Sequence, residues 1–113
     1  MRVISGSLKG KKIIHLQSSN TRPLKDLVKE SIFNIILHSN LFSISLKNSR
    51  VLDLYSGIGS FGIECISRGS MKVTFVEKDK NALNILNQNL KKMSIGDKSE
   101  VFPSEIKSFF DQL

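Results

Sequence analysis

The sequence has few of the residues that build disulfide-rich, metal-binding or membrane proteins. Its 113 residues include one cysteine, two prolines and no tryptophan, and only 7% are aromatic. The single cysteine, Cys65, cannot close an intrachain disulfide, and no spacing of Cys and His is typical of a zinc site. No apolar run approaches the ~20 residues that span a bilayer, and residues 1–6 do not resemble the start of a signal peptide. We therefore expect a protein of the reducing cytoplasm, without a metal or a membrane segment.

The basic charge is unevenly distributed along the chain. There are 17 Lys and Arg against 10 Asp and Glu, for a net charge of +7, and the composition of 40% apolar and 24% charged residues indicates one globular domain. Residues 1–50 hold nine basic and two acidic side chains, whereas residues 51–113 hold eight of each. An anionic polymer is the expected partner of the first segment, because phosphate neutralisation adds up over Lys and Arg on one face. Charge alone does not separate nucleic acid from anionic lipid or from a solvated surface.

The first 48 residues are expected to form an extension and a helix. Two β-prone runs around a glycine-containing turn predict a basic β-hairpin within residues 1–20. Residues 21–48 follow as a helix and a polar linker, and Pro23 suits the first helical turn, where its missing N–H would have no partner anyway. Apolar residues recur there at helical spacing, and this places Lys25 and Lys29 on the solvent face of the helix.

Residues 49–113 show a different pattern, in which short apolar strands alternate with amphipathic helices. We expect strands at 51–54, 73–76 and 100–102, and helices at 60–68, 80–92 and 104–110. Such an alternation is typical of βαβ units, which form a parallel sheet with right-handed crossovers. The predicted fold class is therefore α/β.

The glycine pattern after the first expected strand is the densest chemical signal. Gly57, Gly59 and Gly62 form a Gly-x-Gly-x-x-Gly sequence between a strand and a helix, a context typical of nucleotide or cofactor sites. Gly57 and Gly59 let the backbone approach a ligand closely, and Gly62 lets the helix approach the sheet. The alternative interpretation is a tight turn between strand and helix that binds nothing.

An acidic residue follows the second expected strand. Glu77 comes twenty residues after Gly57, at the position where a carboxylate can accept hydrogen bonds from the hydroxyls of a ribose. The alternative is a surface carboxylate that pairs with Lys78 or Lys80 or lies at a helix N-terminus. The more specific hypothesis is that Glu77 binds the ribose of an adenosine-type cofactor.

A second carboxylate, Asp53, lies inside the first expected strand and bears on the kind of cofactor. The pyrophosphate of a dinucleotide needs a bare helix N-terminus, and a nearby carboxylate would repel it. The same carboxylate would favour a cationic group, such as the sulfonium or ammonium of S-adenosylmethionine. Charge complementarity therefore favours the methyl donor over a dinucleotide.

These motifs carry a resemblance to a known family. Residues 51–62 resemble motif I of the class I S-adenosylmethionine-dependent methyltransferases, and residues 73–79 resemble the motif that follows it. With the upstream blocks, the chain resembles the RsmD-type ribosomal RNA guanine-N2 methyltransferases of bacteria. The resemblance implies a Rossmann-like class I methyltransferase fold, with residues 49–113 as the amino-terminal portion of that domain. The upstream blocks are residues 2–6, 9–12, 21–23 and 29–36.

The resemblance also implies a cofactor, a partner and site residues. It places S-adenosylmethionine against Asp53, Tyr55, Ser56, Gly57 and Gly59, with Glu77 on the ribose and Lys78 beside the adenine. The adenine amine would be held by Glu105, or alternatively by Ser104. The partner would be small-subunit ribosomal RNA, bound by a monomer. The residues expected to face the RNA are Arg2, Lys9, Lys11, Lys12, Thr21, Arg22 and Lys25.

One part of the family pattern is missing. Members supply an Asp/Asn-Pro-Pro-aromatic catalytic loop after the fourth strand, and the two prolines here, Pro23 and Pro103, do not form one. We therefore assign no catalytic residue and expect residues 1–113 alone to be inactive on RNA. Two other functions stay open, a non-catalytic RNA-binding remnant of such an enzyme and a nicotinamide-dependent oxidoreductase. His15, His38 and Cys65 are expected to be structural or surface residues.

Overall fold

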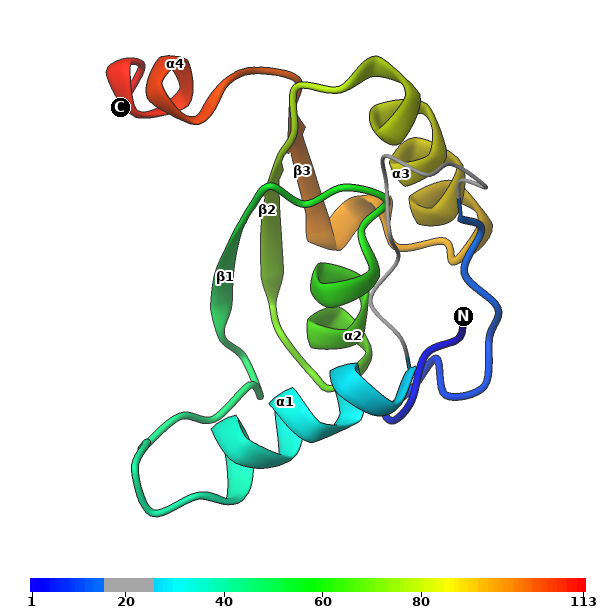
Figure 1. Ribbon diagram of the computed structural model, residues 1–113, viewed down its shortest axis with the longest axis vertical. Coiled ribbons are helices and arrows are strands. Elements are labelled where there is room, and N and C mark those ends of the chain that lie inside the picture. The colour runs from blue at the N-terminus through cyan, green and yellow to red at the C-terminus, as the bar shows by residue number, and fades with distance from the viewer. Residues whose placement is uncertain (16–25) are drawn as a thin grey trace.

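The computed structural model describes residues 1–15 and 26–113, in which three parallel strands form one sheet in the order β1-β2-β3 (Figure 1). The expected α/β class with a parallel sheet is confirmed, and each strand and helix of residues 49–113 lies within about two residues of its expected bounds. The strands are β1 (Arg50–Leu54), β2 (Lys72–Val76) and β3 (Ser99–Phe102). The helices are α1 (Asp26–His38), α2 (Ser60–Ser67), α3 (Lys80–Lys92) and α4 (Ile106–Asp111), with a 3₁₀ turn at Gly96–Lys98.

The core lies between the sheet and helices α2 and α3, which cover one of its faces (Figure 1). Val73 and Phe75 of β2 are completely buried, and the register places Asp53 of β1 beside Phe75. Gly62 of α2 lies against these two β2 side chains, because a Cβ there would come within 2.3 Å of the Phe75 ring. The expectation that Gly62 lets the helix approach the sheet is therefore confirmed.

The amino-terminal segment does not form the expected β-hairpin. Within residues 1–15 its two halves form one antiparallel bridge, Arg2 with Lys12, and three backbone hydrogen bonds join residues 1–3 to residues 10–13. The pairing does not extend into regular strands because the next backbone groups bond to α2: Ile4 and Ser5 donate to Glu64, and Leu8 donates to Ser67 Oγ. A short antiparallel turn held by α2 thus stands in place of two regular strands. Residues 16–20 of the expected hairpin lie outside the described part.

Helix α1 corrects the expectation for Lys29, whose side chain is 0% exposed rather than facing solvent. Its Nζ lies 3.3 Å from Glu64 Oε1 and donates to the Arg2 carbonyl (2.8 Å) and to Ser60 Oγ (3.3 Å). The helix therefore turns its Lys29 side inward and leaves Leu27 75% exposed. Pro23 and Lys25 lie outside the described residues.

Glu64 joins three parts of the molecule, and we call Lys29, Glu64 and Arg68 the Glu64 cluster. The Glu64 carboxylate accepts from the Ile4 and Ser5 amides (2.8 and 3.0 Å) and from Arg68 Nε (2.8 Å). Both Glu64 and Lys29 are fully buried, so neither charge has water as an alternative partner. An ionised side chain in such a place is stable only when it is paired and hydrogen-bonded.

A second buried polar side chain fastens the other end of the segment. Asn89 of α3 accepts from the Ile14 amide (2.8 Å) and donates to the Ile14 carbonyl (2.9 Å), so it binds this backbone as a paired strand would. Its amide also donates to the Ile58 carbonyl (3.0 Å) in the glycine loop. Both contacts had a signal in the sequence, since Glu64 and Asn89 are polar residues at core-facing helical positions, where a buried side chain needs a hydrogen-bond partner.

No helix in the described part of the chain is long and apolar enough to cross a membrane.

Replacing Glu64 by Gln should destabilise the protein strongly. The amide can still accept from the Ile4 N–H, but Lys29 and Arg68 would lose their shared anion. Breaking a buried ion pair by removing one partner costs roughly 3–5 kcal/mol, and we expect that loss of unfolding free energy in urea titrations.

The matched control is Glu100→Gln. Glu100 pairs with Lys72 at 3.7 Å on the surface, where both side chains are substantially exposed, so its loss should cost about 0–1 kcal/mol. Equal effects of the two substitutions would contradict the role given to Glu64.

Candidate functional site

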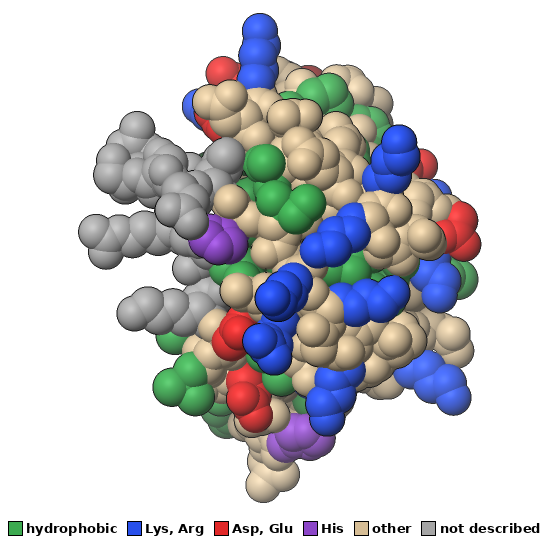
Figure 2. All heavy atoms as spheres, turned by 90° about the vertical axis from the view of Figure 1, so that its right-hand side faces the viewer, with side chains coloured by type: hydrophobic (Ala, Val, Ile, Leu, Met, Phe, Trp, Pro, Cys, Tyr) green, Lys and Arg blue, Asp and Glu red, His purple; other side chains and the backbone are tan. Residues whose placement is uncertain are grey.

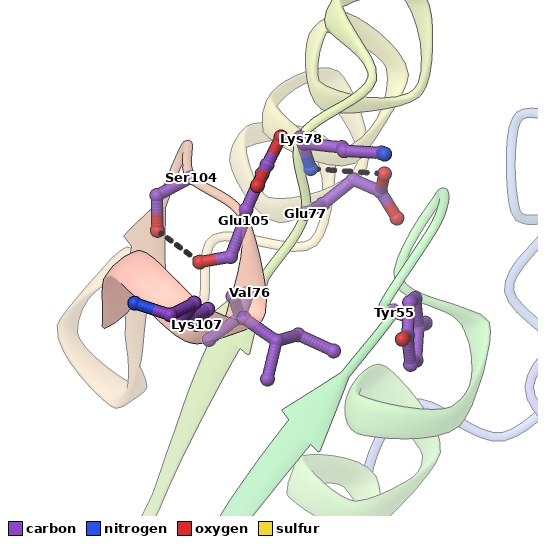
Figure 3. A pocket seen from close by; sticks show the side chains of 8 residues that line it. Tyr55, Val76, Glu77, Lys78, Ser104, Glu105 and Lys107 are labelled. Atoms are coloured by element: carbon purple, nitrogen blue, oxygen red, sulfur yellow. Dashed lines mark hydrogen bonds between the residues drawn. The ribbon is translucent and has the colours of Figure 1, made fainter. Parts of the chain in front are cut away.

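A cavity of about 250 Å³ lies at the carboxyl ends of the strands, at the upper end of the sheet in Figure 1. Tyr55 bounds it after β1, Glu77 and Lys78 after β2, and the residues leading into α4 close the remaining side (Figure 3). Ligands of open α/β sheets bind in this crevice beyond the carboxyl ends of the strands. The lining residues are Tyr55, Val76, Glu77, Lys78, Ser104, Glu105, Ile106 and Lys107.

The glycine loop between β1 and α2 is held in an unusual backbone conformation. Tyr55, Gly57 and Gly59 all have positive φ, at 55°, 56° and 95°. A Cβ on Gly59 would come within 2.5 Å of Leu86, so this position requires glycine for space as well as for conformation. The Ser56 amide donates to the Val76 carbonyl at 3.1 Å, which joins the loop to the end of β2. The loop is therefore anchored before any ligand arrives.

Glu77 is held by backbone amides from both sides of the cavity. Its Oε1 accepts from Gly57 N–H (2.8 Å), and its Oε2 accepts from Lys78 and Asp79 N–H (3.0 and 2.9 Å). A carboxylate has about four acceptor positions, two on each oxygen, so one position on Oε1 remains. This carboxylate is thus fixed in orientation and can accept one more donor.

Asp53 lies behind the glycine loop with one oxygen unsatisfied. Its Oδ2 is buried and has no hydrogen-bond partner among the described residues. Burial raises the pKa of Asp53 from 3.8 to about 6, a hydrogen bond from the Gly62 amide opposes the shift, and the charge of Glu77 adds to it. Burying a polar oxygen without a partner is costly, and the described residues leave this acceptor of Asp53 unfilled.

The structure brings together part of the expected cofactor set. The cavity at the carboxyl ends of the strands is lined by Tyr55, Glu77 and Lys78 and by both alternatives after β3, Ser104 and Glu105. The other four expected residues do not line it but lie in or behind the glycine loop. Val76, Ile106 and Lys107 were not anticipated, although their place next to expected residues at strand and helix ends was a usable signal. The four residues outside the lining are Asp53, Ser56, Gly57 and Gly59.

The expected RNA-facing residues are exposed wherever the structure describes them. Arg2, Lys9, Lys11 and Lys12 all have exposed side chains. Figure 2 shows Lys and Arg side chains spread over the face that carries the amino-terminal segment and α3. Lys92 of α3 contacts the amino-terminal segment on this face, because its Nζ donates to the Lys12 carbonyl at 2.8 Å. The other three, Thr21, Arg22 and Lys25, lie outside the described residues.

The part of the chain that the structure describes offers no metal centre and no reactive thiol. Within residues 1–15 and 26–113 no three His, Cys, Asp or Glu side chains form a group that could hold a metal ion. Cys65 is buried, and this burial, with the charges of Asp53 and Glu64, raises the pKa of its thiol to about 12. A thiol in that state does not act as a nucleophile at neutral pH.

The protein has a Rossmann-like α/β fold, with a parallel sheet, a glycine loop after β1 and an acid after β2. Its cavity lies across the strand ends, where ligands of such folds bind. Among solved structures, the one described as "Putative methyltransferase yhhF from Escherichia coli" matches 96% of this chain with a TM-score of 0.78 and 28% identity. The match covers 55% of that chain. The fold of this protein thus matches that structure over about half of its length.

The chain belongs to the RsmD and YlbH family, because the model described as "Conserved hypothetical protein 95" matches residues 1–113. It is 35% identical over 113 residues to "Ribosomal RNA small subunit methyltransferase D" of Haemophilus influenzae, and 30% identical over 112 residues to the protein of that name in Escherichia coli K12. Each match covers 99% of this chain, but only 55% and 53% of the relatives. The family expected from the motifs is confirmed, and the chain spans about half the length of these relatives.

The raised pKa of Asp53 predicts a specific pH dependence of stability. The folded protein binds the Asp53 proton more tightly than the unfolded chain does, because the pKa of Asp53 is raised from 3.8 to about 6 on folding. The protonated side chain therefore contributes stability that is complete below about pH 4 and is lost as pH rises through about 6. Each pKa unit corresponds to about 1.4 kcal/mol, so the loss amounts to roughly 3 kcal/mol by pH 7. The Asp53→Asn variant keeps an acceptor for Gly62 and lacks this titration.

The measurement is urea unfolding of both proteins between about pH 4 and 7. The difference in unfolding free energy, variant minus wild type, should grow with pH over that range while other titrating groups cancel. A difference that stays constant would show that burial does not perturb Asp53.

Proposed function

We propose that this chain forms the methyl-donor half of an S-adenosylmethionine-dependent enzyme that methylates a guanine exocyclic amine in small-subunit ribosomal RNA. One observation carries the proposal: a buried, unsatisfied Asp53 oxygen and a Glu77 carboxylate with one free position flank the same glycine loop. Membership of a family with ribosomal RNA methyltransferases supports the substrate class. The enzyme would act as a monomer in the cytoplasm, on ribosomal RNA or an assembling small subunit.

The residues present fit such a donor. The free position on Glu77 Oε1 suits one ribose hydroxyl, and a second hydroxyl would have to replace one of the three amide donors. A cavity of about 250 Å³ suits a nucleoside, with Lys78 and Glu105 or Ser104 around the base. The amino-acid end would extend over Gly57 and Gly59 toward Asp53, whose carboxylate complements an ammonium or sulfonium.

The proposed chemistry assigns binding and orientation to this chain. The bound donor would supply an activated methyl group. Glu77 would fix the sugar and Asp53 would attract the cationic end, so that the methyl group is held at one place at the sheet edge. The guanine amine is a weak nucleophile because its lone pair is delocalised into the ring, and an acceptor must take its proton. No described residue is assigned to that step.

Calorimetry with two ligands and two variants tests the donor site. S-adenosylhomocysteine and 5′-methylthioadenosine share the nucleoside and its 5′ sulfur, but only S-adenosylhomocysteine carries the amino-acid end with its ammonium group. Glu77→Gln should weaken both ligands by roughly 10–100-fold, because a hydrogen bond to a charged group is worth about 1.5–3 kcal/mol. Asp53→Asn should weaken S-adenosylhomocysteine by about tenfold or more and leave 5′-methylthioadenosine nearly unchanged.

Glu100→Gln is the matched control, since it removes one acidic charge from β3 outside the cavity. Absence of S-adenosylhomocysteine binding would overturn the donor site. If RNA still bound in that case, the chain would be a non-catalytic RNA-binding module, and NADH binding in a fluorescence titration would indicate an oxidoreductase.

Residues 1–113 alone should bind the donor without methylating RNA. The relatives are about twice the length that this chain spans, and no described residue supplies the acceptor and the stacking surface that the amine needs. The measurement is incorporation of labelled methyl groups into ribosomal RNA, with a complete relative as positive control. Efficient transfer by residues 1–113 would overturn the assignment of the catalytic step to other residues.

A further inference from the structure

A second hollow lies at the opposite edge of the sheet from the donor cavity. It is an open groove of about 740 Å³, formed by the amino-terminal loop, the segment before β1 and the carboxyl end of α2. We call it the amino-edge groove. Its lining residues are Ser5, Gly6, Ser7, Leu37, Ile44, Ser45, Leu46, Lys47, Ile66, Ser67, Arg68, Gly69 and Lys98.

Three basic residues from distant parts of the sequence meet in this groove. Lys47 lies before β1, Arg68 ends α2 and Lys98 lies directly before β3, so all three are at the amino ends of the strands. The lining contains no Asp or Glu. Lys47 and Lys98 are exposed, and no salt bridge pairs either of them within the described residues. The groove therefore presents positive charge that the fold leaves unneutralised.

The Glu64 cluster adds to this charge. Lys29 and Arg68 share the single carboxylate of Glu64, so the cluster keeps a net positive charge in a place with little water. Arg68 uses Nε for Glu64 and stacks over the Phe33 ring at 4.5 Å, which fixes its guanidinium at the groove wall. A fixed guanidinium with free N–H groups is a good phosphate ligand. An anion in the groove would complete the neutralisation of the cluster.

Hydroxyl groups accompany the cations. Ser5, Ser7 and Ser45 line the groove beside the lysines, and serine hydroxyls and backbone amides commonly contact nucleic-acid phosphates. The loop that brings Ser5 and Ser7 continues to Lys9, which is also exposed. An extended polyanion could therefore pass from the groove along the amino-terminal segment, whereas a single small anion would use only part of this surface.

We propose that the amino-edge groove binds the phosphodiester backbone of RNA, as an anchoring site separate from the donor cavity. The strands between the two sites have four or five residues, which corresponds to roughly 17 Å. A bound RNA would thus be held several nucleotides away from the modified base. The proposal rests on the proposed function only in taking RNA as the ligand.

The test is the salt dependence of RNA binding by the whole chain carrying Lys47→Gln and Lys98→Gln. Arg68 is left intact because it also pairs with Glu64. Each phosphate contact contributes about 0.7 to the slope of log K against log salt for single strands, so the double variant should lose roughly 1.4 from the slope. At about 0.1 M salt its affinity for a labelled single-stranded RNA should fall roughly tenfold or more.

Lys72→Gln is the matched control. Lys72 begins β2 at the same edge, but strand alternation places its side chain on the opposite face of the sheet from Val73 and Phe75, which pack under α2. This variant should change the slope little, because Glu100 already neutralises Lys72. The S-adenosylhomocysteine affinity of the double variant, measured by calorimetry, should equal that of the wild type.

The outcomes separate this proposal from the proposed function. An unchanged slope and RNA affinity in the double variant would overturn the groove as an RNA site, whatever the donor result. Binding of inorganic phosphate that depends on Lys47 and Lys98, without any effect of these residues on RNA, would likewise overturn it in favour of a small-anion site. If the wild-type protein did not bind S-adenosylhomocysteine, only the donor site would be overturned.

Discussion

The buried carboxylate of Glu64 is the interaction on which the rest of this structure depends. It is the shared partner of Lys29 in α1, of Arg68 at the end of α2 and of the Ile4 and Ser5 amides. Separating any one of these elements would leave a charge or an amide in a region of low dielectric without a partner. The amino-terminal segment and α1 are therefore integral to the α/β unit, although neither contributes a strand to its sheet.

This constraint extends to the glycine loop. Lys29 reaches Ser60 directly after Gly59, and Asn89 reaches Ile58 while holding the Ile14 backbone. The loop is thus fixed from two sides by groups that also hold the amino-terminal segment. A loop positioned in this way keeps its amides in place for Glu77. The conformational entropy of the loop is therefore lost during folding and not on ligand binding.

The two edges of the sheet differ in the charges that they present. The carboxyl edge carries a small cavity lined by two carboxylates and two lysines, with Asp53 behind the glycine loop, whereas the amino edge carries a larger groove lined by Lys47, Arg68 and Lys98 and by no acid. Acids suit the cationic end and the ribose of a methyl donor, and cations suit phosphates. Because parallel strands all point the same way, one sheet can present at its two edges a mixed-charge cavity and a basic groove.

The strands, the helices and the glycine loop were predictable from the sequence, because periodicity, glycine spacing and an acid after a strand are properties of neighbouring residues. The family was predictable for the same reason, and so was the common position of Tyr55, Glu77, Lys78 and Glu105 at one edge of the sheet. The burial of Lys29, the short turn in place of two regular strands and the amino-edge groove were not predictable. Each arises from groups that are distant in sequence: Glu64 is 35 positions from Lys29, and Lys98 is 51 positions from Lys47. Whether a lysine faces water or a buried carboxylate, and whether scattered cations share one surface, is determined by packing between elements.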